Sequence, residues 1–181
     1  TPWTLFANTA LAVGESIEYV LVKNTRPVDG APASELLVLA STRLAILEGE
    51  VEVLSTFTGK ELLGSRYEQI FIDCAIDLVK YPNALSFLGG NFVSTDDGSG
   101  VVHLAPAFGV DDFEMSKKFG LPMLQPVTPN GHFTTEVVDF AGRAIKNFKY
   151  ADHNEEGADK DIIIAIKKAG KIYKSSMDYV H

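Results

Sequence analysis

A series of short segments rich in β-branched and aromatic residues most constrains what this chain can fold into. Turn-forming residues separate the segments: Gly14 ends the run at 10–13, and Pro27, Gly30 and Pro32 lie close together in the connector at 25–34. Runs of this length and composition predict β-strands. The predicted strands cover residues 17–24, 35–40, 51–57, 67–72, 84–94 and 100–105.

Two central segments carry helix signals instead. Ser41 or Thr42 is expected to cap a short helix through 43–49. Segment 109–120 has acidic residues in its first turn, lysines near its end and a final Gly120. This arrangement suits the helix dipole and predicts a helix.

Near the C-terminus, segment 159–171 has apolar residues at helical spacing, with Asp159 as the expected cap and Gly170 as the stop. The residues expected on one face are Ile162, Ile163, Ile166 and Ala169. Segment 130–142 begins with an Asn-Gly turn signal and continues with β-formers. The prediction is a mainly β domain with peripheral α-helices, whose strand order does not follow from the sequence.

Composition excludes several classes of protein. The chain has 181 residues, of which 46% are hydrophobic and 22% charged, as in an ordinary globular domain. No apolar run approaches the roughly 18 residues of a membrane span, so no membrane partner is expected. The net charge of −8 argues against an autonomous nucleic-acid binder, which needs a basic face. Cys74 is the single cysteine, which excludes an internal disulfide and predicts a reducing, cytoplasmic location.

The two ends of the sequence predict an excised domain. The chain begins with Thr-Pro-Trp and no initiator Met, and it ends on Met-Asp-Tyr-Val-His without a polar tail. We therefore expect residues 1–181 to be one domain of a larger protein.

Several common kinds of site are not indicated. The histidines His103, His132, His153 and His181 are scattered and lack paired ligand spacing, so no metal site is expected. Segment 96–100 lacks the alternating oxygen ligands of a calcium loop. The Gly-Ser-Gly within it leads into a predicted strand and not a helix, so it is not a phosphate loop. Ser99 does not lie in a nucleophile elbow.

His103 and Asp112 form the one pair that points to a ligand site. His103 lies on a predicted strand that ends at Pro106, and Asp112 lies in the first turn of the helix that follows. The two side chains are therefore expected to converge on one cleft, where the helix dipole keeps the carboxylate ionised for pairing with an ammonium group. Alternatively, His103 is a core histidine bonded to backbone, and Asp111 and Asp112 are ordinary charges of a helix start.

The stretches "TPWTLFANTALAV" and "GSGVVHLAPAFGVDDF" resemble the two signatures of the editing domain of isoleucyl-tRNA synthetases, a class I aminoacyl-tRNA synthetase family. Those signatures read T-T-T-P-W-T-L-P-x-N and G-T-G-x-V-H-x-A-P-A-F-G-x-D-D. Weaker similarity extends through 126–142, 158–164 and the terminal Tyr-Val-His. The valyl and leucyl enzymes carry Arg-Pro instead of Thr-Pro-Trp, so the resemblance is to the isoleucyl branch.

The resemblance implies a closed β-barrel with helices, inserted into the catalytic domain of the parent enzyme. It implies hydrolytic proofreading of valyl-tRNA(Ile), and the family is the standard case of such a double sieve. The expected partners are the tRNA(Ile) 3′ end carrying valine, valyl-adenylate and the parent catalytic domain. No cofactor is expected here, since ATP and Mg²⁺ serve the synthetic domain.

The resemblance also assigns roles to single residues. Asp112 would anchor the α-ammonium group of the misattached amino acid, and His103 would form the floor that excludes the larger isoleucine. Thr1 and Thr4 would offer hydroxyls to the substrate or the hydrolytic water. Asn8 would orient its loop or bond near the terminal adenosine.

Trp3 would pack the pocket wall, and no side chain is an obvious general base. The mechanism expected is a positioned water. Two departures stand in the signatures: Phe6 replaces a usual Pro, and Val110 stands where an acidic or small residue is common. The chain also begins at the last of the three usual threonines, which puts full activity of this chain alone in doubt.

Two other functions are compatible with the sequence. In an N-terminal-nucleophile hydrolase the α-amine would activate the hydroxyl of Thr1. In a non-catalytic module the cleft would hold an aminoacyl or nucleotide ligand without turnover.

Overall fold

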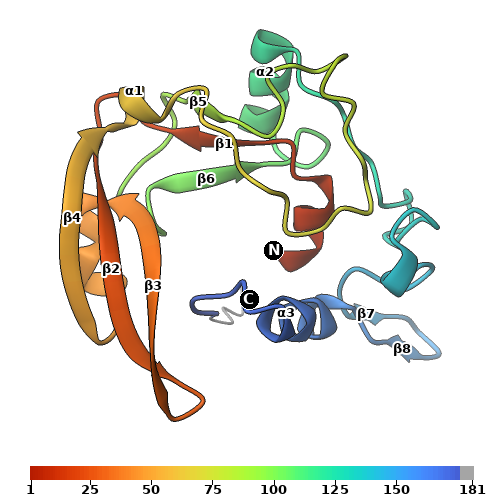
Figure 1. The fold of residues 1–181 in the computed structure, drawn as a ribbon. Coiled ribbons are helices and arrows are strands. Elements are labelled where there is room, and N and C mark those ends of the chain that lie inside the picture. Colours follow the sequence, from red (N-terminus) through yellow and green to blue (C-terminus); the bar gives the residue numbers. More distant parts are fainter. Residues whose placement is uncertain (176–181) are drawn as a thin grey trace.

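The computed structural model describes residues 1–175, and the Tyr-Val-His of the resemblance lies outside them. The described chain forms two three-stranded sheets, a two-stranded ribbon, two longer helices and several short ones (Figure 1). The strands are β1 (Ala10–Val13), β2 (Glu18–Val28), β3 (Ala31–Ala40), β4 (Glu50–Thr58), β5 (Phe87–Gly89), β6 (Val101–Leu104), β7 (Phe148–Lys149) and β8 (Asn154–Glu155). The helices are α1 (Gly59–Leu62), α2 (Val110–Phe119) and α3 (Asp159–Lys168), with 3-10 turns η1 (Pro2–Ala7), η2 (Ser41–Ile46) and η3 (Val138–Phe140).

The smaller sheet, in the order β5-β1-β6, positions the candidate site. Strand β1 lies in the middle, parallel to β5 and antiparallel to β6. The register pairs Leu11 with His103. Because η1 leads directly into β1, this pairing brings the first residues of the chain beside the histidine of the second signature.

The larger sheet has the order β3-β2-β4 and is antiparallel throughout. Its strands β2 and β3 are joined by Asp29 and Gly30 alone, whose φ angles of 51° and 84° fit the tight turn of a two-residue hairpin. The ten-residue connector predicted at 25–34 was therefore wrong. Pro27 pairs with Pro32 beyond the last residue of β2 that pairs with β4, where a missing N–H is tolerated.

A few backbone hydrogen bonds link the larger sheet and the segment that follows it to the smaller sheet. The Ala40 N–H of β3 donates to the carbonyl of Ser99, just before β6, at 2.8 Å, and Phe87 of β5 exchanges hydrogen bonds of 3.0 Å with Gly64 and Ser65, which follow α1. The Tyr19 hydroxyl adds a side-chain link between β2 and the start of β6. The strand ladders within residues 1–175 nevertheless form separate sheets, so the closed barrel expected from the resemblance is not found as one continuous ladder.

The helices predicted at 109–120 and 159–171 form as α2 and α3, whereas the helix predicted at 43–49 is replaced by the 3-10 turn η2. Helix α2 ends at Gly120, whose φ of 64° is left-handed, and α3 is followed by Gly170 with φ 68°. The predicted caps were wrong. Ala158 precedes α3 without a side-chain cap bond, and Ala40 does the same before η2, a 3-10 turn. Of the predicted inner face of α3, Ala169 is exposed.

Three predicted β segments differ in the structure. Residues 67–72 form no strand: Ile70 lines the cavity, and Phe71 stacks on Phe6 of η1. In 84–94 only β5 is extended, and the chain then turns at Gly90. Segment 130–142 makes the predicted turn, but isolated bridges replace a strand.

The main core lies between η1 and α3. Phe6 is 2% exposed, and its ring stacks on Phe71 with centroids 4.1 Å apart. Ile162 and Ile166 of α3 are buried in the same cluster. This packing fixes the first turn of the chain against the last described helix. No helix of residues 1–175 is long and apolar enough to cross a membrane.

Candidate functional site

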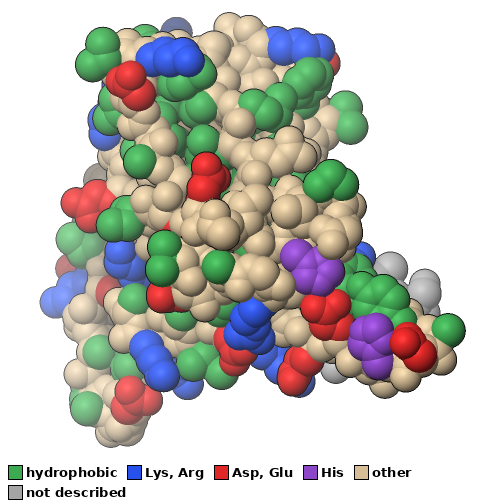
Figure 2. Space-filling view, turned by 90° about the vertical axis from the view of Figure 1, so that its right-hand side faces the viewer, with side chains coloured by type: hydrophobic (Ala, Val, Ile, Leu, Met, Phe, Trp, Pro, Cys, Tyr) green, Lys and Arg blue, Asp and Glu red, His purple; other side chains and the backbone are tan. Residues whose placement is uncertain are grey.

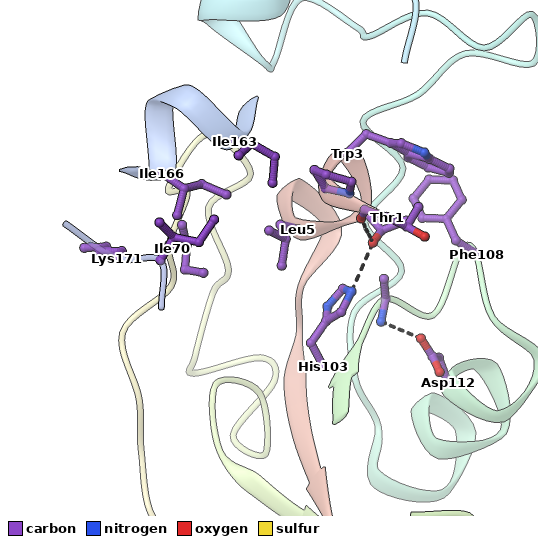
Figure 3. A pocket seen from close by; sticks show the side chains of 14 residues that line it. Thr1, Trp3, Leu5, Ile70, His103, Phe108, Asp112, Ile163, Ile166 and Lys171 are labelled. Atoms are coloured by element: carbon purple, nitrogen blue, oxygen red, sulfur yellow. Dashed lines mark hydrogen bonds between the residues drawn. The ribbon is translucent and has the colours of Figure 1, made fainter. Parts of the chain in front are cut away.

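A cavity of about 530 Å³ opens between η1, the end of β6, the start of α2 and the C-terminal segment (Figure 3). Its lining is mostly apolar, with His103 and Asp112 on one side and the isoleucines of α3 on the other. The lining residues are Thr1, Pro2, Trp3, Thr4, Leu5, Ile70, His103, Ala105, Phe108, Asp112, Ile163, Ile166, Lys171 and Ile172.

His103 lies on β6 and forms part of the inner wall. Its Nε2 is 3.0 Å from the Thr4 hydroxyl, and its Nδ1 is 3.3 Å from the amide nitrogen of Asn8. Both ring nitrogens are thus occupied by residues of the N-terminal stretch. Burial is the main cause that lowers the pKa of His103, the Asp112 carboxylate opposes it, and the α-amino group of Thr1 lowers it further. The ring is therefore neutral near pH 7.

Asp112 lies in the first turn of α2, as the sequence predicts. Its carboxylate accepts a hydrogen bond of 2.8 Å from the backbone N–H of Ala105. Gly109 leaves room for this contact, since a Cβ there would lie 2.8–3.0 Å from the carboxyl atoms of Asp112. A fixed carboxylate at a helix start, beside an apolar cavity, is suited to hold an ammonium group.

Trp3 and Phe108 form one wall together. Their rings meet edge to face, with centroids 4.8 Å apart and an interplanar angle of 78°. Thr4 is only 8% exposed, and its hydroxyl donates to the Thr1 carbonyl at 2.8 Å. The hydroxyl proton of Thr4 is therefore already donated in a hydrogen bond within the protein.

Five of the six predicted site residues line the cavity: Thr1, Trp3, Thr4, His103 and Asp112. Asn8 does not. It lies buried behind His103, where its amide contacts the ring, so the geometry favours orientation over direct substrate contact. The roles assigned to all six residues stay predictions.

Sequence reasoning missed several parts of the site. Phe108 lies within the second signature but was given no role, and Ile70 was expected on a strand at 67–72; both line the cavity. Ile163 and Ile166 were predicted as an inner helix face, and the structure places that face against the cavity. Tyr67 lies behind Asn8, and its hydroxyl donates to the Asn8 side-chain oxygen.

The charges around the cavity are few. Lys171 lies on the side opposite Asp112 in Figure 3. On the outer face of the domain, acidic and basic side chains are interspersed with hydrophobic ones (Figure 2). Within residues 1–175 no three His, Cys, Asp or Glu side chains are grouped so as to hold a metal ion.

Comparison with known proteins identifies the class of this fold. The crystal structure of GlLeuRS-CP1 matches with a TM-score of 0.57 over 98% of this chain and 82% of that one, at 14% identity. The fold is therefore that of a CP1-type domain.

Sequence relatives name the family. Isoleucine–tRNA ligases of Bdellovibrio bacteriovorus and Clostridium acetobutylicum are 41% and 39% identical over 96% and 97% of the chain. That of Mycobacterium tuberculosis (strain H37Rv) is 40% identical over 80% of it. The chain belongs to the isoleucine–tRNA ligase family and spans about 15% of the length of the first two relatives. No family model matches the chain.

Proposed function

We propose that this domain removes valine from mischarged tRNA(Ile) by hydrolysing the aminoacyl ester. The observation that carries the proposal is the convergence of Asp112 and His103 on one apolar cavity. The carboxylate offers a partner for the α-ammonium group, and the apolar walls suit a small aliphatic side chain. The relatives' name, isoleucine–tRNA ligase, supplies the tRNA and the amino acid that must be distinguished.

The cavity supports exclusion of isoleucine by shape. His103 is held from both ring nitrogens, and Trp3 is braced by Phe108. Because neither ring can move without breaking these contacts, an extra methylene meets rigid walls. Two buried polar partners make the histidine a poor proton acceptor for water.

The chemistry proposed therefore relies on position and not on a general base. With Asp112 holding the ammonium group, the ester would be presented at a fixed distance from a bound water. Orientation and electrostatic stabilisation would then supply the rate. We propose no metal or cofactor for this step, with ATP and Mg²⁺ confined to the synthetic domain.

The proposed partners are the 3′ end of tRNA(Ile), with valyl-adenylate as a second substrate, and the remainder of a parent synthetase in the cytoplasm. The backbone contacts that connect the two sheets are proposed to correspond to the barrel of the family.

Deacylation of valyl-tRNA(Ile) and isoleucyl-tRNA(Ile) by the parent enzyme tests this proposal. Asp112→Asn keeps an oxygen for the Ala105 N–H and removes the charge, so valine release should fall at least tenfold. Asp111→Asn is the matched control on the same exposed helix turn. If wild type and both variants release valine equally, the role of Asp112 is wrong.

A non-catalytic binding module is the second candidate, favoured by one observation: both nitrogens of His103 are occupied. It predicts that a valyl-adenosine analogue binds to the domain while valyl-tRNA(Ile) stays intact. The N-terminal-nucleophile alternative predicts that extending the chain before Thr1 abolishes turnover.

A further inference from the structure

A hydrogen-bond chain runs from Tyr67 to the cavity. The Tyr67 hydroxyl contacts the Asn8 side-chain oxygen, and the Asn8 amide nitrogen contacts Nδ1 of His103 at 3.3 Å. On the other side of the ring, Nε2 lies 3.0 Å from the Thr4 hydroxyl, which donates to the Thr1 carbonyl at 2.8 Å.

The backbone carbonyls of Ala10 and Thr1 fix the donor and the acceptor of each hydrogen bond in this series. The Asn8 amide nitrogen also donates to the Ala10 carbonyl at 3.2 Å. A carbonyl only accepts, so the NH₂ group of Asn8 must face Ala10 and His103, and its oxygen must face Tyr67. Tyr67 is then the donor to that oxygen.

The ring of His103 consequently has one assignment. Nδ1 faces an NH₂ group, so it must be unprotonated and accept. Nε2 must carry the proton, because the Thr4 hydroxyl donates its own proton to the Thr1 carbonyl and can therefore only accept from the ring.

We propose that Tyr67, acting through Asn8, is a positioning residue that holds His103 in the neutral Nε2–H tautomer at the cavity floor. Protonation of Nδ1 would place two donors against each other unless the Asn8 amide turned over. Turning it would break the bonds to Tyr67 and to the Ala10 carbonyl. The consequence for discrimination between amino acids rests on the proposed function.

The charged groups that face His103 are consistent with the neutral Nε2–H tautomer. The Asp112 carboxylate from α2 favours the protonated ring, while burial and the α-amino group of Thr1 favour the neutral one. Their balance lowers the pKa of His103, in agreement with the hydrogen-bond geometry. Burial also raises the pKa of Tyr67, which keeps its hydroxyl a donor.

The experiment is nitrogen NMR of the 181-residue chain labelled in its histidine rings, with His103 assigned by its loss in His103→Gln. We expect an unprotonated Nδ1 and a protonated Nε2 at neutral pH. Tyr67→Phe keeps the ring that packs against Phe87 and removes only the hydroxyl, so it should raise the titration midpoint of His103 and mix the tautomers. Tyr150→Phe, outside the cavity lining, is the matched control and should change neither the titration midpoint nor the tautomer of His103.

A second variant gives the opposite chemistry. Asn8→Asp replaces the donor with a carboxylate that only accepts, so Nδ1 should gain a proton. The proposal is overturned if wild-type His103 carries its proton on Nδ1. It is also overturned if His103 has the same titration midpoint in Tyr67→Phe as in the wild type. The same holds if Nδ1 of His103 stays unprotonated in Asn8→Asp.

Activity provides a separate readout. In the parent enzyme, Tyr67→Phe should lower the ratio of valine release at about pH 6 to that at about pH 7.5, because part of His103 becomes charged. An unchanged ratio, with the wild type active, contradicts the inference. If the wild-type enzyme releases no valine, the proposed function fails, and the NMR result still decides the tautomer.

Discussion

The carboxylate of Asp112 accepts a hydrogen bond from the backbone N–H of Ala105 at 2.8 Å, which joins the end of β6 to the first turn of α2. The contact places the negative charge at the cavity and satisfies a donor where the strand ladder stops. It also depends on the absence of a side chain at Gly109.

Gly109→Ala should displace the Asp112 carboxylate. The added Cβ would lie 2.8–3.0 Å from the carboxyl atoms, so the side chain must turn away and release the Ala105 N–H, a net loss of about 1 kcal/mol. We expect lower thermal stability and slower release of valine from valyl-tRNA(Ile). Val110→Ala, at a neighbouring side chain that is 82% exposed, is the control and should leave both unchanged. Full activity of Gly109→Ala would show that the position of the carboxylate is not critical.

The stability of the domain should fall as the solution is acidified through the ordinary pKa of histidine. The pKa of His103 is lowered in the folded state, chiefly by burial, so the unfolded chain binds more protons in this range. For this group, stability is therefore constant only well above about pH 6.5 and declines as the pH falls through that value. Urea unfolding of wild type and His103→Gln at several pH values measures the effect, which should be smaller in the variant. If the free energies of unfolding of wild type and His103→Gln change with pH in parallel, the prediction is contradicted.

Tyr19→Phe should destabilise the connection between the two three-stranded sheets. The Tyr19 hydroxyl accepts from the Gly14 N–H at 3.1 Å and donates to the Gly100 carbonyl at 2.6 Å, and the side chain is fully buried. Removing the hydroxyl leaves two buried backbone groups without that partner, a loss of about 1–3 kcal/mol. The free energy of unfolding in urea tests this value. Tyr81→Phe, at a half-buried side chain outside both three-stranded sheets, should lie within about 0.5 kcal/mol of wild type.

Phe6→Ala should be among the most damaging core substitutions. Phe6 is 2% exposed, stacks on Phe71 and meets Phe133 edge to face. Loss of a buried phenylalanine costs about 3–5 kcal/mol. Chemical denaturation should show this loss, whereas Ile72→Ala, at a side chain 81% exposed, should change little. A small effect at Phe6 would mean that the core rearranges to fill the space.

The parts of the fold that could be predicted are those with local signals. Helix α2 has acidic residues at its start, lysines at its end and a left-handed Gly120, all of which act within one or two turns. Strand β6 and the position of His103 on it follow from the β-branched run before Pro106. The convergence of Asp112 on the same cavity could also be predicted, since only a short loop separates strand and helix.

The rest depends on partners far away in the sequence. Residues 67–72 look like a strand, but Ile70 and Phe71 are apolar because they meet the cavity and Phe6. Asn8 was expected either to orient its loop or to bond near the terminal adenosine, and its amide is satisfied by Ala10, His103 and Tyr67 behind the wall. Nothing local to Asn8 or Tyr67 indicates that pairing, because 59 residues separate them.

The cavity is lined at once by the first residues of the chain and by the last described helix. A ribosome that has completed residues 1–158 has therefore made His103 and Asp112 but not the wall that α3 supplies. Contacts of such long sequence separation form late. During synthesis, the nascent domain can bind no ligand that needs the complete enclosure until almost its whole length has emerged.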